Sequence, residues 1–303
     1  MQLLEKINQL KNAHKAVILA HNYQPAEIQD IADFTGDSLG LSIKAAETDA
    51  ELIVFCGVQF MAETAAILSP EKTVLLPDKL AGCPLADMIT AEQLRELKQQ
   101  HPDALVVCYV NSSAEVKAES DYCCTSSNAV EIVNSLPESG EIIFVPDRHL
   151  GQHVIEQTGR DLILWPGYCH VHVVITEEDI ENNKAKYPDA VVMAHPECTE
   201  PVKALADQIV STGGMLNFVG KSTAKRFVVA TEVGMIHALQ RQNPNAEYFP
   251  ASKRAVCPNM KRITLEKILW ALEDMQYKIT VPEPTRINAR KALDRMVEIL
   301  PAN

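Results

Sequence analysis

Three cysteines lie at nearly equal intervals along this chain of 303 residues. Cys83 and Cys169 are 86 residues apart, and Cys257 follows 88 residues later. Each one closes a copy of the same kind of segment, so the chain reads as three successive repeats. A repeat constrains the fold strongly, because the copies share one structure and must bury their apolar faces against each other. One cysteine per copy predicts that three thiols meet at a single shared site.

Four polar positions recur in the same register when Ala16, Ala104 and Ala190 are aligned. The aligned sets are His21, Tyr109 and His195; Tyr23, Asn111 and Glu197; Asp33, Asp121 and Asp207; and Ser38, Ser126 and Thr212. Chance rarely places so many polar residues in one frame over so short a stretch. The agreement supports the repeat independently of the cysteines.

The apolar pattern of each copy predicts an α/β fold. Three short runs rich in Val, Ile and Leu show no alternation, which is typical of parallel strands buried on both faces, and helical stretches alternate with them. Capping-box patterns at Thr90 and Thr176 mark helix starts. We expect repeats of roughly 90 residues that pack tightly, because domains of that size bury modest cores. The expected limits are 1–86, 87–172 and 173–263, followed by a helical extension over 264–303.

Composition narrows the class of protein. The net charge of −12 argues against a nucleic-acid partner, and 47% apolar residues are ordinary for a globular domain. No run of 18 apolar residues predicts a membrane span. The N-terminal segment has helical period and mixed charge rather than an apolar signal core, which points to the cytoplasm. Eight cysteines in that setting suggest metal or redox chemistry rather than disulfides.

A pair of polar residues two positions apart follows the first apolar run in each copy. Residues two apart in extended backbone point to the same side, and open α/β sheets bind ligands at the carboxyl ends of their strands. One such pair would also fit a solvent-facing strand end, but three in register favour a functional site. The pairs are His21 and Tyr23, Tyr109 and Asn111, and His195 and Glu197.

A Ser or Thr opens a predicted helix in each copy, at Ser38, at Ser126 and at Ser211–Thr212. Hydroxyl and N–H groups at helix starts bind anions. Three such starts around one centre would suit a substrate with several carboxylates or a phosphate. Plain N-capping explains the same residue types, and the two roles are compatible.

The three spaced cysteines fit a metal centre. Three thiolates without a fourth ligand suit a [4Fe–4S] cluster with one open iron that acts as a Lewis acid. Zinc is the alternative, because three protein ligands and a water form its catalytic pattern. The other cysteines do not recur between copies. We expect Cys56, Cys108 and Cys198 to pack in the core, and the adjacent pair at 123–124 is left open between packing and redox sensitivity.

Several stretches are distinctive as sequence: AHNYQ (20–24), QDIADFTGDSL (29–39), GVQFMAET (57–64), YVNSSAE (109–115), CTSSNAVE (124–131), HPEC (195–198), STGGM (211–215) and TEVGMIH (231–237). Together they resemble the quinolinate synthase family of de novo NAD biosynthesis, from Lys15 to about Glu266. The resemblance implies a triplicated three-layer αβα fold with short parallel sheets and pseudo-threefold symmetry. It also implies a central [4Fe–4S] cluster held by Cys83, Cys169 and Cys257.

The same resemblance implies a reaction. Iminoaspartate and dihydroxyacetone phosphate would condense to quinolinate with release of phosphate and two waters, a transferase activity. Glu197 would be the general base, with Tyr23, Tyr109 and His21 as further catalytic groups. An L-aspartate oxidase, which makes the unstable iminoaspartate, is the expected partner. The implied substrate-binding residues are His21, Ser38, Tyr109, Asn111, Ser126, His172, His195, Glu197, Ser211 and Thr212.

Three other classes of protein share part of this pattern. A triplicated three-cysteine reductase of isoprenoid diphosphates would not carry the three polar pairs. An iron–sulfur sensor would not need an array of acid and base residues. A small-molecule binding protein with incidental cysteines would lack iron and sulfide, so their content separates it from the enzymes.

Overall fold

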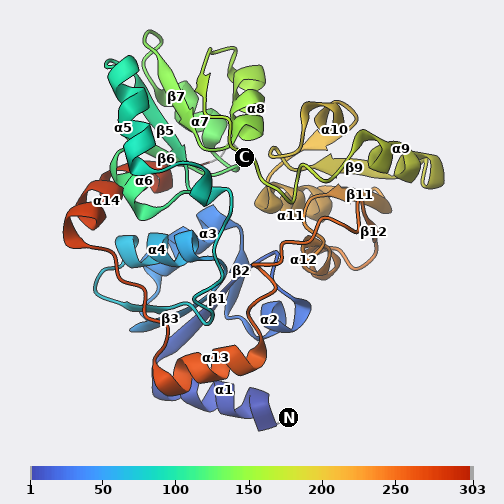
Figure 1. Ribbon diagram of the computed structural model, residues 1–303. Helices are drawn as coiled ribbons and strands as arrows, with labels where there is room; N and C mark the ends of the chain where they lie inside the picture. Colours follow the sequence, from blue (N-terminus) through green and yellow to red (C-terminus); the bar gives the residue numbers. More distant parts are fainter. Residues whose placement is uncertain (1, 301–303) are drawn as a thin grey trace.

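Three parallel sheets of identical topology make up the fold. The computed structural model describes residues 2–300, and its three lobes surround a common centre (Figure 1). The strand orders are β2-β1-β3-β4, β6-β5-β7-β8 and β10-β9-β11-β12. The predicted fold class, three repeated αβα units with short parallel sheets, is confirmed. The strands are β1 Ala16–His21, β2 Phe34–Gly36, β3 Leu52–Cys56, β4 Thr73–Leu75, β5 Leu105–Tyr109, β6 Tyr122–Cys124, β7 Ile142–Val145, β8 Ile163–Leu164, β9 Val191–Ala194, β10 Gln208–Ile209, β11 Arg226–Ala230 and β12 Glu247–Pro250.

Helices cover both faces of each sheet. The pairs α3 and α4, α7 and α8, and α11 and α12 pack together in their repeats, as do α5 with α6 and α9 with α10. The chain leaves the first strand of each sheet to one side and then crosses to the other, which places helices on opposite faces. The helices are α1 Gln2–Ala13, α2 Ala26–Ile31, α3 Ser38–Glu47, α4 Gln59–Leu68, α5 Ala91–Gln100, α6 Ala114–Ala118, α7 Ala129–Ser135, α8 Arg148–Thr158, α9 Glu177–Lys186, α10 Glu200–Ala204, α11 Thr212–Lys221, α12 Met235–Gln242, α13 Leu265–Asp274 and α14 Glu283–Glu298, with a 3₁₀ turn at Ala86–Met88.

The predicted register between the repeats is confirmed at atomic detail. In each repeat a carboxylate just before the second strand accepts the backbone N–H of a residue in the first strand, at 2.8 Å in all three cases. In each repeat this bond holds the start of the second strand against the first strand. The pairs are Asp33 with Ile18, Asp121 with Val106, and Asp207 with Val192.

Each sheet contains one strand that the apolar pattern did not predict. β2, β6 and β10 are edge strands of two or three residues. A segment that short has too few residues to display a periodicity, and it is fixed by pairing with the first strand of its sheet. The two predicted helix starts at Thr90 and Thr176 are confirmed as full capping boxes.

Three buried side chains join the repeats in a cycle. Each lies at the same repeat position and donates to the carbonyl of an equivalent residue at the start of a helix in the preceding repeat, with the third repeat preceding the first in the cycle. Because these donors are almost fully buried, each bond also satisfies a polar group that water cannot reach. The bonds run from Lys117 to Phe60, from Lys203 to His149 and from Gln29 to Gly234, at 3.3, 2.9 and 3.1 Å.

The C-terminal helices close the outside of the molecule. α13 packs against α1, and α14 packs against α6, β6 and α4, so α14 bridges the first two repeats (Figure 1). Their apolar residues belong to the same core as the first two sheets. Over residues 2–300, no helix combines the length and the apolar character that crossing a membrane requires.

Candidate active site

One cavity lies where the carboxyl ends of the three sheets converge. The first strand of each sheet lies between its second and third strands, so the chain crosses sides there and leaves a crevice that suits a ligand. All of the predicted site residues except Ser211 line this cavity. Those residues are His21, Tyr23, Ser38, Cys83, Tyr109, Asn111, Ser126, Cys169, His172, His195, Glu197, Thr212 and Cys257.

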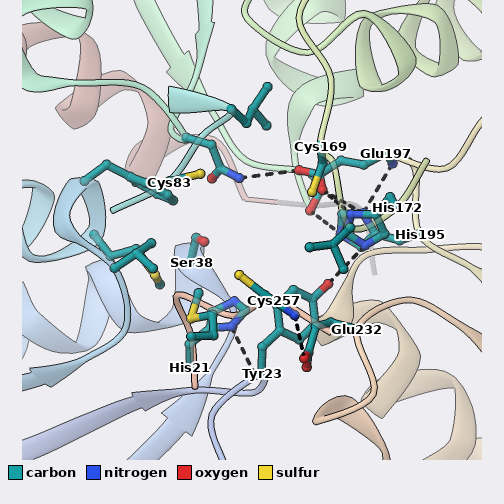
Figure 2. Close-up of a pocket in the computed structure, with 18 of the residues that line it drawn as sticks. His21, Tyr23, Ser38, Cys83, Cys169, His172, His195, Glu197, Glu232 and Cys257 are labelled. Atoms are coloured by element: carbon teal, nitrogen blue, oxygen red, sulfur yellow. Dashed lines mark hydrogen bonds and ion pairs between the residues drawn. The ribbon is translucent and has the colours of Figure 1, made fainter. Parts of the chain in front are cut away.

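The three spaced cysteines approach the cavity from three repeats. Figure 2 shows the sulfur atoms of Cys83, Cys169 and Cys257 around one open region. These three are partly exposed free thiols, whereas the other five cysteines are buried and do not line the cavity. The separation matches the prediction for Cys56, Cys108 and Cys198. The cysteines at 123–124 are also buried in the core, at the end of β6, where Cys123 pairs with Cys108 of β5.

Burial gives the three thiols a strong preference for the neutral state unless a cation joins them. It raises the pKa of Cys83 to about 12, and it raises the pKa of Cys169 and of Cys257 as well. Each of the first two thiols is further disfavoured as an anion by another cysteine of the set. Thiolates are the soft ligands that iron–sulfur clusters and zinc select. The donor set therefore fits a metal centre, whose charge would offset the cost of three buried thiolates.

A second group of metal ligands shares one of these thiols. One ligand atom each from Cys169, His172 and Glu197 lies within 4.8 Å of the others. Sulfur, imidazole and carboxylate together are the donors of a mononuclear zinc site. The cavity thus offers two overlapping ligand sets, of which only the three-cysteine set uses every repeat.

Two histidines at equivalent positions act as neutral donors toward the cavity. Nδ1 of His21 accepts the backbone N–H of Tyr23 at 3.1 Å, and Nδ1 of His195 accepts that of Glu197 at 3.3 Å. Burial lowers the pKa of both imidazoles to about 3, helped by Lys261 for His21 and by His172 for His195. Because Nδ1 is used as an acceptor, the proton of each neutral ring resides on Nε2.

Glu197 is surrounded by hydrogen-bond donors. Its Oε2 lies 2.6 Å from Nδ1 of His172, and its Oε1 accepts from Nδ2 of Asn111 at 3.4 Å. Burial alone would raise the pKa of this carboxyl, but His172, His195 and the Tyr109 hydroxyl together lower it to about 2. The rings of His172 and His195 stack at 4.5 Å between centroids. Glu197 is thus a fixed, ionised acceptor (Figure 2). We call the polar side of the cavity formed by Glu197, His172, His195, Asn111 and Tyr109 the polar wall.

Thr231 connects this wall to Tyr23 and was missed by the sequence analysis. Its hydroxyl lies 2.6 Å from the phenol oxygen of Tyr23 and 2.8 Å from Nε2 of His172. With Nδ1–H of His172 directed at Glu197, Nε2 accepts from Thr231, and Thr231 accepts from Tyr23. Burial and the charge of Glu197 raise the pKa of Tyr23, so its phenol keeps its proton. The four residues form one continuous row of polar contacts, in which Nδ1 of His172 lies 2.6 Å from Oε2 of Glu197.

Glu232 is a second buried group that the sequence analysis missed. It lines the cavity next to Cys257 and is fully buried. Both Thr231 and Glu232 belong to the TEVGMIH stretch that contributed to the family resemblance. Neither recurs as the same residue type in the other repeats, where Gly57 and Val58 or Pro146 and Asp147 take their places.

The helix starts differ from one repeat to the next. Ser38 and Thr212 begin α3 and α11, behind the N-caps Asp37 and Ser211. The expected helix start at Ser126 is wrong, because α7 begins only at Ala129.

The reason is a local turn. The Asn128 side chain accepts the backbone N–H of Thr125 at 2.8 Å and its hydroxyl at 3.0 Å, which holds residues 125–128 out of the helix. Ser126 still lines the cavity and lies 3.2 Å from Nε2 of His195. Ser211 caps its helix and bonds Ser127 at 2.8 Å, so it supports the wall from behind.

Comparison with known proteins gives a consistent result over nearly the whole chain. The profile of the family described as quinolinate synthetase A protein matches residues 5–298. A quinolinate synthase of Dehalococcoides mccartyi (strain CBDB1) is 56% identical over 295 residues, 97% of each chain. One from Geobacter metallireducens is 55% identical over 295 residues, again 97% of each. Quinolinate synthase 2 of Methanosarcina acetivorans is 53% identical over 297 residues, 98% of this chain and 96% of that protein.

Proposed function

This chain belongs to the quinolinate synthetase A family, and from that premise we propose that it is a quinolinate synthase. Its substrates would be iminoaspartate and dihydroxyacetone phosphate, and its products quinolinate, phosphate and two waters. One C–C and one C–N bond form the ring, and the phosphate and the two waters leave, so atoms balance without an oxidant. The observation that carries the proposal is the convergence of three thiols and Glu197 on one cavity.

The cofactor proposed for this site is a [4Fe–4S] cluster held by Cys83, Cys169 and Cys257. When bound, the cluster supplies one iron without a protein ligand, which acts as a Lewis acid toward a carboxylate, amine or hydroxyl of the substrate. One thiol from each repeat and their common cavity support this assignment. Zinc on Cys169, His172 and Glu197 is the competing arrangement.

Glu197 is proposed as the general base. It is ionised, its two oxygens are oriented by Asn111 and His172, and it faces the cavity. Oδ1 of Asn111 is buried and has no hydrogen-bond partner in the part of the chain that the structure describes. That oxygen can accept from a substrate N–H and hold the substrate nitrogen beside the base. Such positioning of two small molecules accounts for much of the rate that a site of this kind provides.

Proton traffic is proposed to follow the chain from Glu197 through His172 and Thr231 to Tyr23. The distances of 2.6, 2.8 and 2.6 Å are all those of hydrogen bonds. For a proton taken up by Glu197 to reach Tyr23, the chain must have the opposite polarity: Nδ1 of His172 accepts it, Nε2–H donates to Thr231, and Thr231 donates to Tyr23. Tyr23 then gives its own proton to a leaving hydroxyl or phosphate. Tyr109, which bonds Glu197 directly and whose pKa is raised by burial, is the second candidate donor.

Anion binding is proposed to rest on neutral donors. Of the described residues that line the cavity, none is a lysine or an arginine. Nε2–H of His21 and of His195, the hydroxyls of Ser38, Ser126 and Thr212, and the N-termini of α3 and α11 would hold carboxylate and phosphate groups. Neutral donors also avoid competing with an open iron for the same anions. Ser211 would act indirectly, through the start of α11.

The direct test is product formation by anaerobically purified protein. Incubation with dihydroxyacetone phosphate and freshly generated iminoaspartate should give quinolinate, detected by mass spectrometry, and one phosphate per quinolinate. Glu197→Gln should reduce turnover by about 100-fold or more if Glu197 is the base, with unchanged iron and sulfide content. Glu181→Gln, an exposed glutamate on α9, is the matched control. Full turnover by Glu197→Gln with an intact cluster would refute the assignment of the base.

Two further proposals concern the setting of the enzyme. Iminoaspartate hydrolyses in water, so an L-aspartate oxidase that releases it nearby would be a useful partner. The cytoplasm is the proposed location, on the grounds of the free thiols. Co-purification of the two enzymes from cells would test the first proposal.

A further inference from the structure

Two buried carboxylates stand at equivalent places in the second and third repeats. Asp147 lies two residues after β7, and Glu232 lies two residues after β11. The last residues of these strands pair with the same position of their neighbours, which fixes the equivalence. Both carboxylates are fully buried. A buried carboxylate is electrostatically costly unless hydrogen bonds satisfy both of its oxygens, so the cost of these two depends on their partners.

Asp147 ties the loop of one proposed cluster ligand to the start of a helix. Its Oδ1 accepts the backbone N–H groups of His149 at 2.9 Å and Leu150 at 2.8 Å, which caps α8. Its Oδ2 accepts the backbone N–H of Cys169 at 3.1 Å. Oδ1 therefore caps the helix, and Oδ2 fixes the peptide from which the Cys169 side chain projects.

Glu232 makes the same two kinds of contact in the third repeat. Its Oε2 accepts the backbone N–H of Gly234 at 2.7 Å, two residues onward as in Asp147 to His149. Its Oε1 accepts the backbone N–H of Cys257 at 3.1 Å. Lys261 pairs with this carboxylate at 3.0 Å and also donates to the carbonyl of Tyr23. These groups pack so closely around Gly234 that a Cβ there would lie only 2.7–2.8 Å from atoms of Lys261, Tyr23 and Glu232.

The first repeat lacks this device. Val58 occupies the equivalent place. A backbone bond two residues before the cysteine is common to all three repeats: Gln59 to Ala81 at 2.7 Å, Arg148 to Gly167 at 2.9 Å and Val233 to Ala255 at 3.0 Å. The carboxylates are thus not a requirement of the αβα fold, since one repeat forms without them. In the second and third repeats they add a bond to the cysteine N–H itself, beyond the backbone bond that all three repeats share.

We propose that Asp147 and Glu232 are positioning residues that hold the backbone of Cys169 and Cys257 so that both thiols face the proposed cluster. Only a carboxylate has an acceptor at both ends of its fork, whereas an amide would direct an N–H at a backbone N–H. The amide variants should therefore release one loop each and leave the other in place. Partners behind metal ligands commonly set the affinity for the metal in this way.

The inference rests on the proposed cluster ligands, so its test includes a readout that needs no cluster. Asp147→Asn and Glu232→Gln would be alkylated with iodoacetamide as metal-free full-length chains, and each cysteine would be followed by peptide mass spectrometry. We expect faster labelling of Cys169 alone in the first variant and of Cys257 alone in the second. With the cluster bound, each variant should lose iron to a chelator about tenfold faster or more.

Matched controls come from the repeat itself. Asp121→Asn and Asp207→Asn remove carboxylates that also accept a backbone N–H, in the same two repeats but at the other end of the strand. They should change neither the labelling of the two cysteines nor the loss of iron. If the amide variants unfold, all eight cysteines will label together, and Asp147→Glu and Glu232→Asp then take their place with the same selective pattern expected.

The outcomes separate this inference from the proposed function. Unchanged labelling of Cys169 and Cys257 in folded variants, or equal acceleration of both thiols by either variant, would overturn the positioning role. If the parent takes up no iron or sulfide while the variants still show the selective labelling, the cluster assignment is wrong and the positioning role of the two carboxylates holds.

Discussion

The hydroxyl of Thr231 lies 2.6 Å from the phenol oxygen of Tyr23, although 208 residues separate them along the chain. The same hydroxyl lies 2.8 Å from Nε2 of His172. Through this one side chain, a tyrosine from the first repeat joins His172, whose Nδ1 lies 2.6 Å from Oε2 of Glu197. The contact links groups from different repeats into the single row of polar groups that we propose as a path for protons.

Replacement of Thr231 by Val should interrupt that path while keeping the shape of the side chain. We expect kcat to fall by about 100-fold, the lower range for loss of an acid–base group, with a smaller change in KM. Thr231→Ser keeps the hydroxyl and should stay within a few fold of the parent. Steady-state kinetics of quinolinate formation would check both, and equal kcat values for the Val variant and the parent would exclude the relay.

The cycle of buried donors between the repeats predicts a stability effect far from the cavity. Lys117→Met would remove the bonds of the ammonium to the carbonyl of Phe60 at 3.3 Å and to the Thr64 hydroxyl at 2.9 Å. The Thr64 hydroxyl still donates to that carbonyl at 2.8 Å. The expected loss is about 1–3 kcal/mol of unfolding free energy, the usual contribution of buried hydrogen bonds from a charged group. Lys253→Met, at an exposed position, should be close to neutral.

Urea unfolding followed by circular dichroism would measure both variants. Lys117 is fully buried, and desolvation lowers its pKa. An increase in stability on substitution would show that Lys117 does not help to hold the repeats together. Such a result would mean that burial of the ammonium costs more than its bonds return.

His153 predicts how stability depends on pH. Burial and the nearby Lys203 lower its pKa to about 4 from an ordinary value of 6.5. The folded state therefore resists a proton that the unfolded state accepts. Its contribution is complete above pH 6.5 and is lost as pH falls toward 4, by up to about 3 kcal/mol.

His153→Gln should flatten that acid limb of the stability curve. The measurement is the difference in unfolding free energy between parent and variant at pH 8 and again near pH 4.5. We expect the parent to lose stability relative to the variant on acidification. A constant difference between the two pH values would show that His153 titrates alike in both states.

The sequence predicted those parts of the molecule that repeat. Asp33, Asp121 and Asp207 were aligned from spacing alone, and each makes the same 2.8 Å bond. The three cysteines, placed by the same spacing, all reach the cavity. A repeat reveals such positions because one structural demand is met three times by similar residues.

Features that differ between the three repeats could not be predicted from the alignment. Thr231 corresponds to Gly57 and Pro146, so nothing in the alignment marked its hydroxyl. The start of α7 was misplaced because Asn128 folds a turn onto Thr125, a contact that the Ser-rich composition of 125–127 does not disclose. Edge strands of two or three residues escape detection for a different reason, since only pairing defines them.

The measurement that tests the account most directly is the iron and acid-labile sulfide content of anaerobically purified protein. The account predicts about four of each per chain for the parent. It predicts large losses in Cys83→Ala, Cys169→Ala and Cys257→Ala, and an unchanged content in Cys198→Ala, whose thiol is buried away from the cavity. A parent with one zinc and no sulfide, or full iron and sulfide in any of the first three variants, would contradict it.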